Sequence, residues 1–206
     1  MKIIIVALSL MLCFSFSCAT TPKDLPNYVD SAAAKSAQGD RAGAIDDYNK
    51  AIELITRSSS AVTPMLSDIY FNRGVCKKIT GDLAGAIDDY TKAIELDPKE
   101  DGAYYNRANA KRDMGNRVGA INDYTRTIEL SPKDVGAYNN RAYVKMSLGD
   151  FKGAIKDFDE TIKLTPEQGD LYYNRAIAKD KIRDDQGASN DFHKARELGY
   201  PAVNKY

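Results

Sequence analysis

The stretch GAIDDYTKAIELDP, residues 85–98, decides the fold, because the chain contains five versions of it. The other four occupy residues 43–54, 119–132, 153–166 and 187–199. The glycines that open the last four versions are 34 residues apart, and Gly43 lies 42 residues before Gly85, so the first unit carries an eight-residue insertion. A fixed period of this length is the signature of proteins built by stacking one small structural unit.

Each version of the phrase predicts a helix. In residues 85–98, Ala86, Tyr90, Ala93 and Ile94 fall at helical spacings, which places them on one apolar stripe. A second helical segment comes before each phrase, for example over residues 104–114. Two helices per unit are therefore expected, each with one face turned toward a common core.

The boundaries of these helices are marked by specific residue types. A Gly-Asp or Gly-Asn pair separates the two helices in the first four units, at residues 39–40, 81–82, 115–116 and 149–150. Glycine suits the left-handed conformation that ends one helix, and Asp or Asn caps the start of the next. Pro98, Pro132 and Pro166 stop the second helix of their units. Each unit is thus predicted as helix, tight turn, helix and loop.

These features resemble the tetratricopeptide repeat family, whose pattern also includes a small residue followed four residues later by an aromatic one, as in Ala86 and Tyr90. The resemblance covers about residues 25–199. It implies an all-α fold, a right-handed α-solenoid (superhelix) of five helix–turn–helix repeats whose first helices line a concave groove. Within a domain of residues 25–206 we assign the repeats to residues 25–58, 67–100, 101–134, 135–168 and 169–202, with residues 59–66 as an insertion.

The first unit departs from the family pattern at its end. Thr56 stands where proline is usual, and a polar stretch follows. We predict a loop over residues 58–63, with Thr63 capping a lengthened helix whose first residue is Pro64.

The fifth unit departs in a different way. Arg183 replaces the turn glycine, and Ser189 and Arg196 stand where other units have Ile. The end of a solenoid must present a polar face to water. With Asn190 and His193, these residues lead us to predict that the fifth repeat serves as its own cap.

The first 24 residues lie outside the repeats. Met1-Lys2 and the 14-residue apolar run after it predict a signal peptide over residues 1–17, because a membrane span needs about 20 apolar residues. We favour Cys18 as the lipidated first residue of an exported bacterial lipoprotein, with residues 18–24 as a polar tether, on the periplasmic or surface side of a membrane. Cleavage after Ala19, which would give a soluble periplasmic or secreted protein, is the alternative.

The composition argues against several function classes. The chain has 29 basic and 29 acidic residues, so no basic excess points to a nucleic acid. One histidine, His193, and one remaining thiol, Cys76, are too few for a tetrahedral zinc site, and they lie three repeats apart. The glycines are spaced as turns rather than as a phosphate-binding loop. We therefore expect no metal, no cofactor and no catalytic residues.

An Arg with a Lys four residues later, such as Arg107 and Lys111, recurs in the first helices of units 2 to 5. Such residues share a helix face, and the family usually has Leu and an aromatic residue here, turned toward the partner helix. That partner helix offers an Asp, such as Asp123, so we predict structural ion pairs, with the Lys stems packing over the turn. The predicted pairs are Arg73 with Asp89, Arg107 with Asp123, Arg141 with Asp157 and Arg175 with Asp191. A basic stripe for a polyanion is the less favoured alternative, because the acids recur as regularly as the bases.

The asparagine before each of these arginines faces another way, because consecutive helical residues point about 100° apart. A ladder of such amides can hydrogen-bond the backbone of an extended peptide while tyrosine and methionine cover its side chains. The alternative is that each Asn serves only its own repeat. The predicted groove residues are Phe71, Asn72, Val75, Lys78, Tyr105, Asn106, Asn109, Arg112, Asn139, Asn140, Tyr143, Met146, Tyr173 and Asn174, together with Ile177.

The sequence thus predicts a non-catalytic scaffold that binds a partner protein or extended peptide in its groove, at the bacterial cell envelope. Tetratricopeptide domains that grip a C-terminal carboxylate use Lys and Asn in their first unit. This chain has Val29 and Ala33 there, so a carboxylate clamp is not expected. The alternative from another class is a solute- or lipid-binding accessory of an envelope transporter, which would need a closed apolar pocket.

Overall fold

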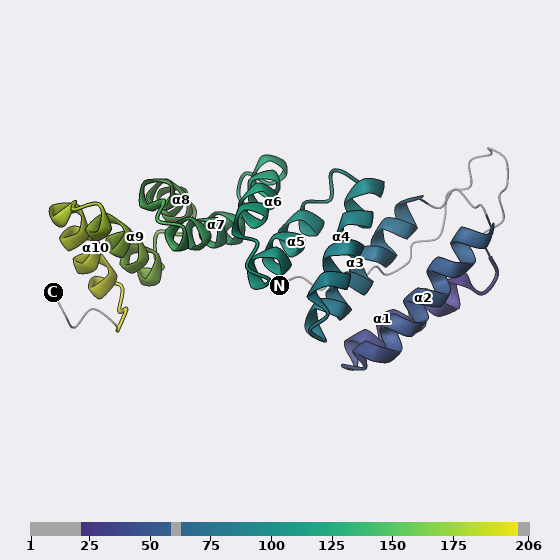
Figure 1. Ribbon diagram of the computed structural model, residues 1–206. Helices are drawn as coiled ribbons and strands as arrows, with labels where there is room; N and C mark the ends of the chain where they lie inside the picture. The colour runs from purple at the N-terminus through teal and green to yellow at the C-terminus, as the bar shows by residue number, and fades with distance from the viewer. Residues whose placement is uncertain (1–21, 59–62, 202–206) are drawn as a thin grey trace. The chain divides into compact units, whose positions relative to one another are not determined.

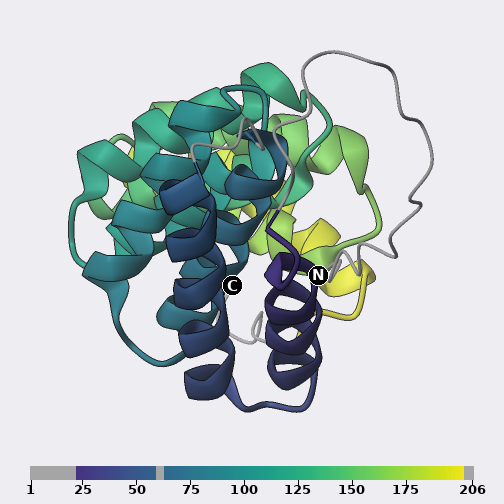
Figure 2. The same cartoon turned by 90° about the vertical axis from the view of Figure 1, so that its right-hand side faces the viewer.

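A computed structural model describes residues 22–58 and 63–201, and its regular elements in those ranges are all α-helices (Figure 1). The helices follow one another as pairs, in which the first contacts the second along its length. They are α1 (Leu25–Ala37), α2 (Arg41–Ser58), α3 (Thr63–Ile79), α4 (Leu83–Leu96), α5 (Asp101–Asp113), α6 (Arg117–Leu130), α7 (Val135–Ser147), α8 (Phe151–Leu164), α9 (Gly169–Lys181) and α10 (Asp185–Glu197). Figure 2 shows one such pair, α1 and α2, side by side and joined by a short turn. The prediction of an all-α fold of consecutive helix pairs is confirmed.

The chain divides into two compact units, one ending at Pro98 and the other beginning at Lys99. The N-terminal unit holds α1 to α4, and α2 packs on α3 between its two pairs. The C-terminal unit holds α5 to α10, with α6 packed on α7 and α8 on α9. The second helix of one pair therefore rests on the first helix of the next within each unit.

The turn inside each pair is set by a glycine and a cap. Gly81 has φ +91°, a conformation that favours glycine, and it ends α3. Asp82 then accepts a hydrogen bond of 2.9 Å from the backbone N–H of Gly85, which caps α4. The Asp82 carboxylate also occupies the space that a Cβ of residue 85 would need, so a larger residue at 85 would have to displace this cap. In the last pair Arg183 adopts φ 62°, the one non-glycine residue with positive φ in the described ranges.

The helix ends agree with the proline positions where proline is present. Helix α4 ends at Leu96, two residues before Pro98. Without such a proline, α2 continues to Ser58, whose hydroxyl donates to the carbonyl of Ile55 at 3.0 Å. Helix α3 already includes Thr63, so the predicted loop over 58–63 is too long by one residue at each end. Residues 59–62 lie outside the described ranges.

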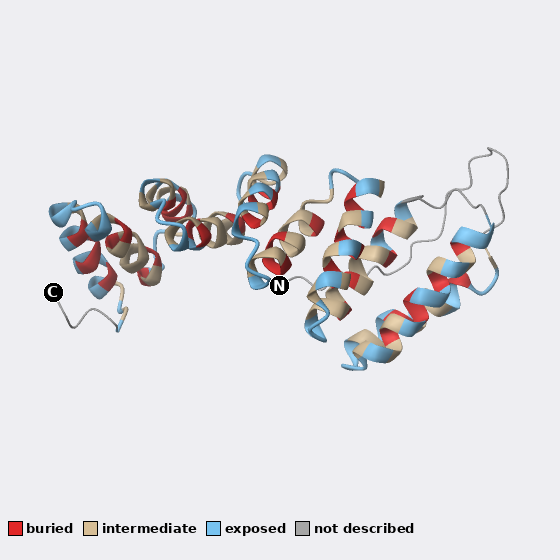
Figure 3. Ribbon diagram, viewed as in Figure 1, coloured by how far each residue is buried: buried red, intermediate tan, exposed pale blue. Residues whose placement is uncertain are grey.

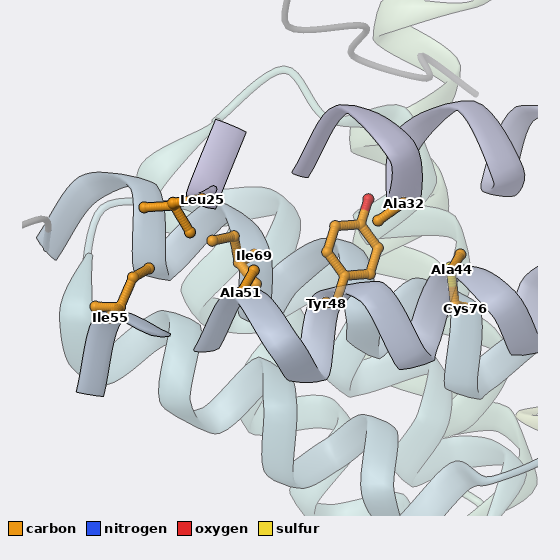
Figure 4. Close-up of a cluster of buried hydrophobic side chains, with 8 residues drawn as sticks. All are labelled: Leu25, Ala32, Ala44, Tyr48, Ala51, Ile55, Ile69 and Cys76. Atoms are coloured by element: carbon orange, nitrogen blue, oxygen red, sulfur yellow. The ribbon is translucent and has the colours of Figure 1, made fainter. Parts of the chain in front are cut away.

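The core is made of small residues facing large ones. In the N-terminal unit the buried cluster consists of Leu25, Ala32, Ala44, Tyr48, Ala51, Ile55, Ile69 and Cys76 (Figure 4). In the C-terminal unit, fully buried Tyr124 packs among Ala108, Ala120 and Ala137. Alanine lets the helices approach closely enough for one aromatic ring to fill each layer. Figure 3 shows the buried residues on the helix faces that meet, while the turns are exposed. The last helix ends this series with exposed polar side chains at Ser189, Asn190, His193 and Arg196.

Candidate functional site

The predicted Arg–Asp pairs are brought together by the structure, and each carboxylate also holds a lysine. In the α5–α6 pair, Nε and Nη2 of Arg107 donate to the two carboxylate oxygens of Asp123 at 2.8 Å each. Nζ of Lys111 lies 2.8 Å from the same carboxylate. The Asp123 side chain is only 7% exposed, so a planar, two-point contact with an arginine is well suited to its desolvated oxygens.

The same arrangement recurs in the other pairs, and we call it the ion-pair column. Its members are Arg73 and Lys77 on Asp89, Arg107 and Lys111 on Asp123, Arg141 and Lys145 on Asp157, and Arg175 and Lys179 on Asp191. In the first pair Ser31 replaces the arginine, and Ser31 and Lys35 both bond Asp47 at 2.6 Å. The lysine contact was missed from sequence because the lysine was expected to lie over the turn, although its spacing from the arginine already placed it on the same face.

The third arginine nitrogen links neighbouring helix pairs. Nη1 of Arg141 donates to the Thr125 hydroxyl at 2.9 Å, and Nη1 of Arg175 donates to Asp159 at 2.7 Å. In the N-terminal unit Arg73 reaches Asn49 at 2.6 Å in the same way. These arginines therefore hold the fold within a pair and between successive pairs.

The electrostatics of the first pair follow from its hydrogen bonds. The bond from Lys35, followed by that from Ser31, lowers the pKa of Asp47 against the opposing effect of burial. The bond to Asp47 in turn raises the pKa of Lys35. Both groups are thus held in their charged forms across neutral pH.

A hollow of about 580 Å³ lies beside this column on α7, α8 and α9. Arg141, Lys145 and Arg175 line it, but each is already bound to a carboxylate. Because these three cations are engaged by acids, they favour a structural role over the polyanion alternative.

A second surface, which we call the first-helix face, carries five of the predicted groove residues on α5, α7 and α9: Tyr105, Asn140, Tyr143, Tyr173 and Asn174. Asp170 of α9, which was not predicted from the sequence, also belongs to it. Nδ2 of Asn140 donates to the Tyr105 hydroxyl at 2.9 Å. Nδ2 of Asn174 donates to the Tyr143 hydroxyl at 2.6 Å. These amides therefore tie successive first helices together, and in the described residues no donor reaches their carbonyl oxygens.

Two other asparagines are turned inward or along their own helix. Nδ2 of Asn106 donates to the carbonyl of Gly102 in α5 at 2.9 Å. Asn109 is only 5% exposed and accepts a 2.6 Å hydrogen bond from the buried Tyr124 hydroxyl. The prediction that Asn109 lines an open groove is therefore wrong, because the amide is buried and serves as the hydrogen-bond partner of the Tyr124 phenol. Oδ1 of Asn139 is buried as well, and nothing in the described residues donates to it.

The tyrosines of the first-helix face pack against buried aromatic rings of the second helices. Tyr105 packs on Tyr124 with ring centroids 6.0 Å apart, and Tyr143 packs edge-on against Phe158 at 5.8 Å. In α5 the tyrosine comes four residues before the asparagine, at 105 and 109, whereas in α7 the order is reversed, at 139 and 143. This exchange moves the ring toward the end of α7, where Tyr143 is 40% exposed.

The remaining predicted groove residues are paired with other side chains, packed on the core or partly buried, so less of their surface is available to a partner. Arg112 pairs with Asp113 at 2.9 Å, and Met146 packs against a buried cluster around Phe158. In the N-terminal unit Phe71 packs on Tyr90 at 5.9 Å. Asn72, Val75, Lys78 and Ile177 are partly buried at the matching places of α3 and α9.

Neither a metal site nor a membrane span is found within residues 22–58 and 63–201. No group of three or more His, Cys, Asp and Glu side chains is clustered there, and no helix in those ranges has the length and apolar character to cross a bilayer. Cys18 lies outside the described ranges.

Comparison with known families identifies the repeats. The tetratricopeptide repeat profiles match residues 67–100 and 105–169. Tetratricopeptide repeats are thus present in both units of the chain. Repeats of this kind typically serve as scaffolds for protein–protein contacts.

Solved structures share this fold. A crystal structure of MamA protein superposes with a TM-score of 0.77 at 25% identity, covering 85% of this chain and 92% of that one. MamA residues 41 to the end from Desulfovibrio magneticus RS-1 gives a TM-score of 0.75 at 16% identity, covering 87% and 97%. YrrB, described as a TPR protein with an unusual peptide-binding site, gives 0.74 at 20% identity, covering 85% and 87%. No curated protein matches the sequence significantly.

Proposed function

We propose that this chain is a non-catalytic scaffold that binds an extended segment of a partner protein on the first-helix face of its C-terminal unit. The observation that carries the proposal is the division of labour on α7. Arg141 and Lys145 are bound to Asp157 and stabilise the fold, whereas Tyr143 presents 40% of its surface to solvent.

The hydrogen bonds of this face support a way in which such a segment would be held. The Asn140 and Asn174 donors are used between helices, so their carbonyl oxygens remain to accept backbone N–H groups of the partner. Tyrosines fixed by these bonds lose little conformational entropy when a peptide covers them. The YrrB structure provides a precedent, since this scaffold carries a peptide-binding site in that protein.

Peptide selection tests the proposal directly. The purified chain is exposed to a displayed library of random dodecapeptides, and dissociation constants of the selected peptides are measured for wild type, Tyr143→Ala and Tyr138→Ala. Tyr138 is the matched control, because it lies on the same helix and stacks on Arg141 of the ion-pair column. We expect Tyr143→Ala to weaken binding and Tyr138→Ala to preserve it.

Two results would contradict the proposal. One is selection of no peptide at all; the other is equal loss of binding in both tyrosine variants. A small molecule that co-purifies with the chain in a native mass spectrum would instead support the transporter-accessory alternative.

The proposal includes an envelope location, with Cys18 lipidated after removal of residues 1–17. It rests on the apolar run and the polar tether of the sequence. Cys18→Ser is expected to release the protein from membranes; unchanged membrane retention would rule out the lipid anchor.

A further inference from the structure

Three tyrosines and one carboxylate gather at the C-terminal end of the first-helix face. Tyr173 of α9 lies against Tyr200, with ring centroids 4.9 Å apart and the rings tilted by 40°. The Tyr143 hydroxyl is held by Asn174, the residue next to Tyr173. Tyr143 is thereby fixed beside these rings while much of its own surface stays exposed.

Asp170 supplies the charge of this cluster. It lies in the first turn of α9, where the helix dipole favours a negative side chain. No cation in the described residues forms an ion pair with it. Asp170 lies one helical turn before Tyr173 and Asn174, and Asn174 is the residue that binds the Tyr143 hydroxyl. In agreement with this placement, the pKa of Tyr143 is raised first by burial and then by Asp170 and Tyr200.

Within the C-terminal unit, a carboxylate at the place of Asp170 is found only in the last repeat. The corresponding residues of α5 and α7 are Gly102 and Gly136. Gly136 leaves room for the Tyr105 hydroxyl, which lies 3.0 Å from where its Cβ would be. Within the C-terminal unit, the last repeat alone therefore adds a carboxylate to the tyrosines at this point, whereas α3 of the N-terminal unit has Asp68 at the matching place.

This combination selects a cation. The faces of aromatic rings attract ammonium and guanidinium groups, and a carboxylate beside them adds a charge-assisted hydrogen bond. Arg112, the arginine among the predicted groove residues, is paired with Asp113 instead. We propose, on the basis of the proposed function, that Tyr143, Tyr173, Tyr200 and Asp170 form a site for one Lys or Arg side chain of the bound partner segment.

The test uses the dodecapeptides selected on the full chain. Sequencing is expected to show Arg or Lys enriched at one peptide position. Replacing that residue by norleucine or citrulline is expected to weaken binding about tenfold, as loss of one cation–π and carboxylate contact implies. Asp170→Asn should weaken binding of the Arg or Lys peptide by a similar factor and leave the norleucine peptide unaffected.

Asp185→Asn is the control, because Asp185 is an exposed carboxylate in the first turn of α10 and lies outside the first-helix face. It should bind all peptides as wild type does. Selected peptides without a basic preference, or equal effects of the Asp170 and Asp185 variants, would overturn the cation site while leaving peptide binding intact. Selection of no peptide would overturn the proposed function itself, so the two failures are distinguishable.

Discussion

Helix α7 has two faces: the residues of one recur in the other repeats, and the residues of the other change from repeat to repeat. The face toward α8 carries Arg141 and Lys145. An arginine and a lysine recur at the matching places of α3, α5 and α9, and in each pair they bind the equivalent aspartate of the second helix. On the other side of α7, Asn139 and the exposed Tyr143 stand where α5 has Tyr105 and Asn109, so the order of asparagine and tyrosine is reversed. Residues that repeat without change serve the scaffold common to all repeats. Residues that change are free to give one repeat a property that the others lack.

The largest effect is expected from breaking the ion-pair column at its carboxylate. Asp123→Leu leaves both Arg107 and Lys111 without their buried partner, so we expect a loss of about 3–5 kcal/mol in the free energy of unfolding. Arg107→Leu should cost less, because Lys111 still neutralises Asp123.

The double variant Arg107→Leu/Asp123→Leu should be more stable than the sum of the two single losses predicts. The second substitution removes the guanidinium that Asp123→Leu leaves without its buried partner, and the long side chain of Lys111 can reach water. Urea denaturation of the four proteins measures the coupling. Additive losses would mean that the pair contributes nothing as a pair.

The next largest effect on stability is expected from the buried hydroxyl groups of Tyr124 and Tyr90. Tyr124 donates to Asn109, but Tyr90, at the matching place of α4, has a buried hydroxyl with no partner in the described residues. Val75 stands where α5 has Asn109, which explains the difference. Tyr124→Phe should therefore destabilise by about 1–2 kcal/mol, whereas Tyr90→Phe should be neutral or stabilising. Thermal unfolding of both variants decides this, and equal losses would refute the role given to Asn109.

A smaller gain in stability is expected in the turn between α9 and α10, where Arg183 stands in place of the usual glycine. Arg183 adopts φ 62°, whereas glycine occupies this place in the other turns inside the helix pairs. Arg183→Gly should raise the free energy of unfolding by about 1 kcal/mol, because it removes the steric cost of a left-handed side-chain-bearing residue. A melting temperature equal to or below that of wild type would contradict this.

The smallest effect is a pH dependence in the first pair, which lacks the arginine. The pKa of Asp47 is lowered in the folded state, chiefly by the hydrogen bond from Lys35. Its contribution is therefore present above the ordinary carboxyl pKa near 4 and is lost as the pH falls through the lowered folded value. The stability difference between wild type and Asp47→Asn should shrink between pH 7 and pH 3. A difference that stays constant over this range would contradict the assignment.

The repeat period, the turns and the ion pairs were within reach of the sequence, because each depends on residues at fixed spacings. Gly81, Asp82 and Pro98 act through local backbone geometry, so their roles are readable one repeat at a time. The burial of Asn109 was not readable, because it depends on a hydroxyl that reaches it from the next helix. The cluster of Tyr143, Asp170 and Tyr200 was missed for a similar reason, since it joins residues from two repeats and a segment beyond the last helix.

The central claim is that the two faces of α7 have separate functions, and two substitutions only two residues apart test it. For a selected peptide, the dissociation constant and the free energy of unfolding are measured for Arg141→Leu and Tyr143→Ala. We expect Arg141→Leu to lower stability while its folded form binds the peptide as wild type does, and Tyr143→Ala to lose binding with a smaller loss of stability. Loss of binding in folded Arg141→Leu, with normal binding by Tyr143→Ala, would contradict the claim.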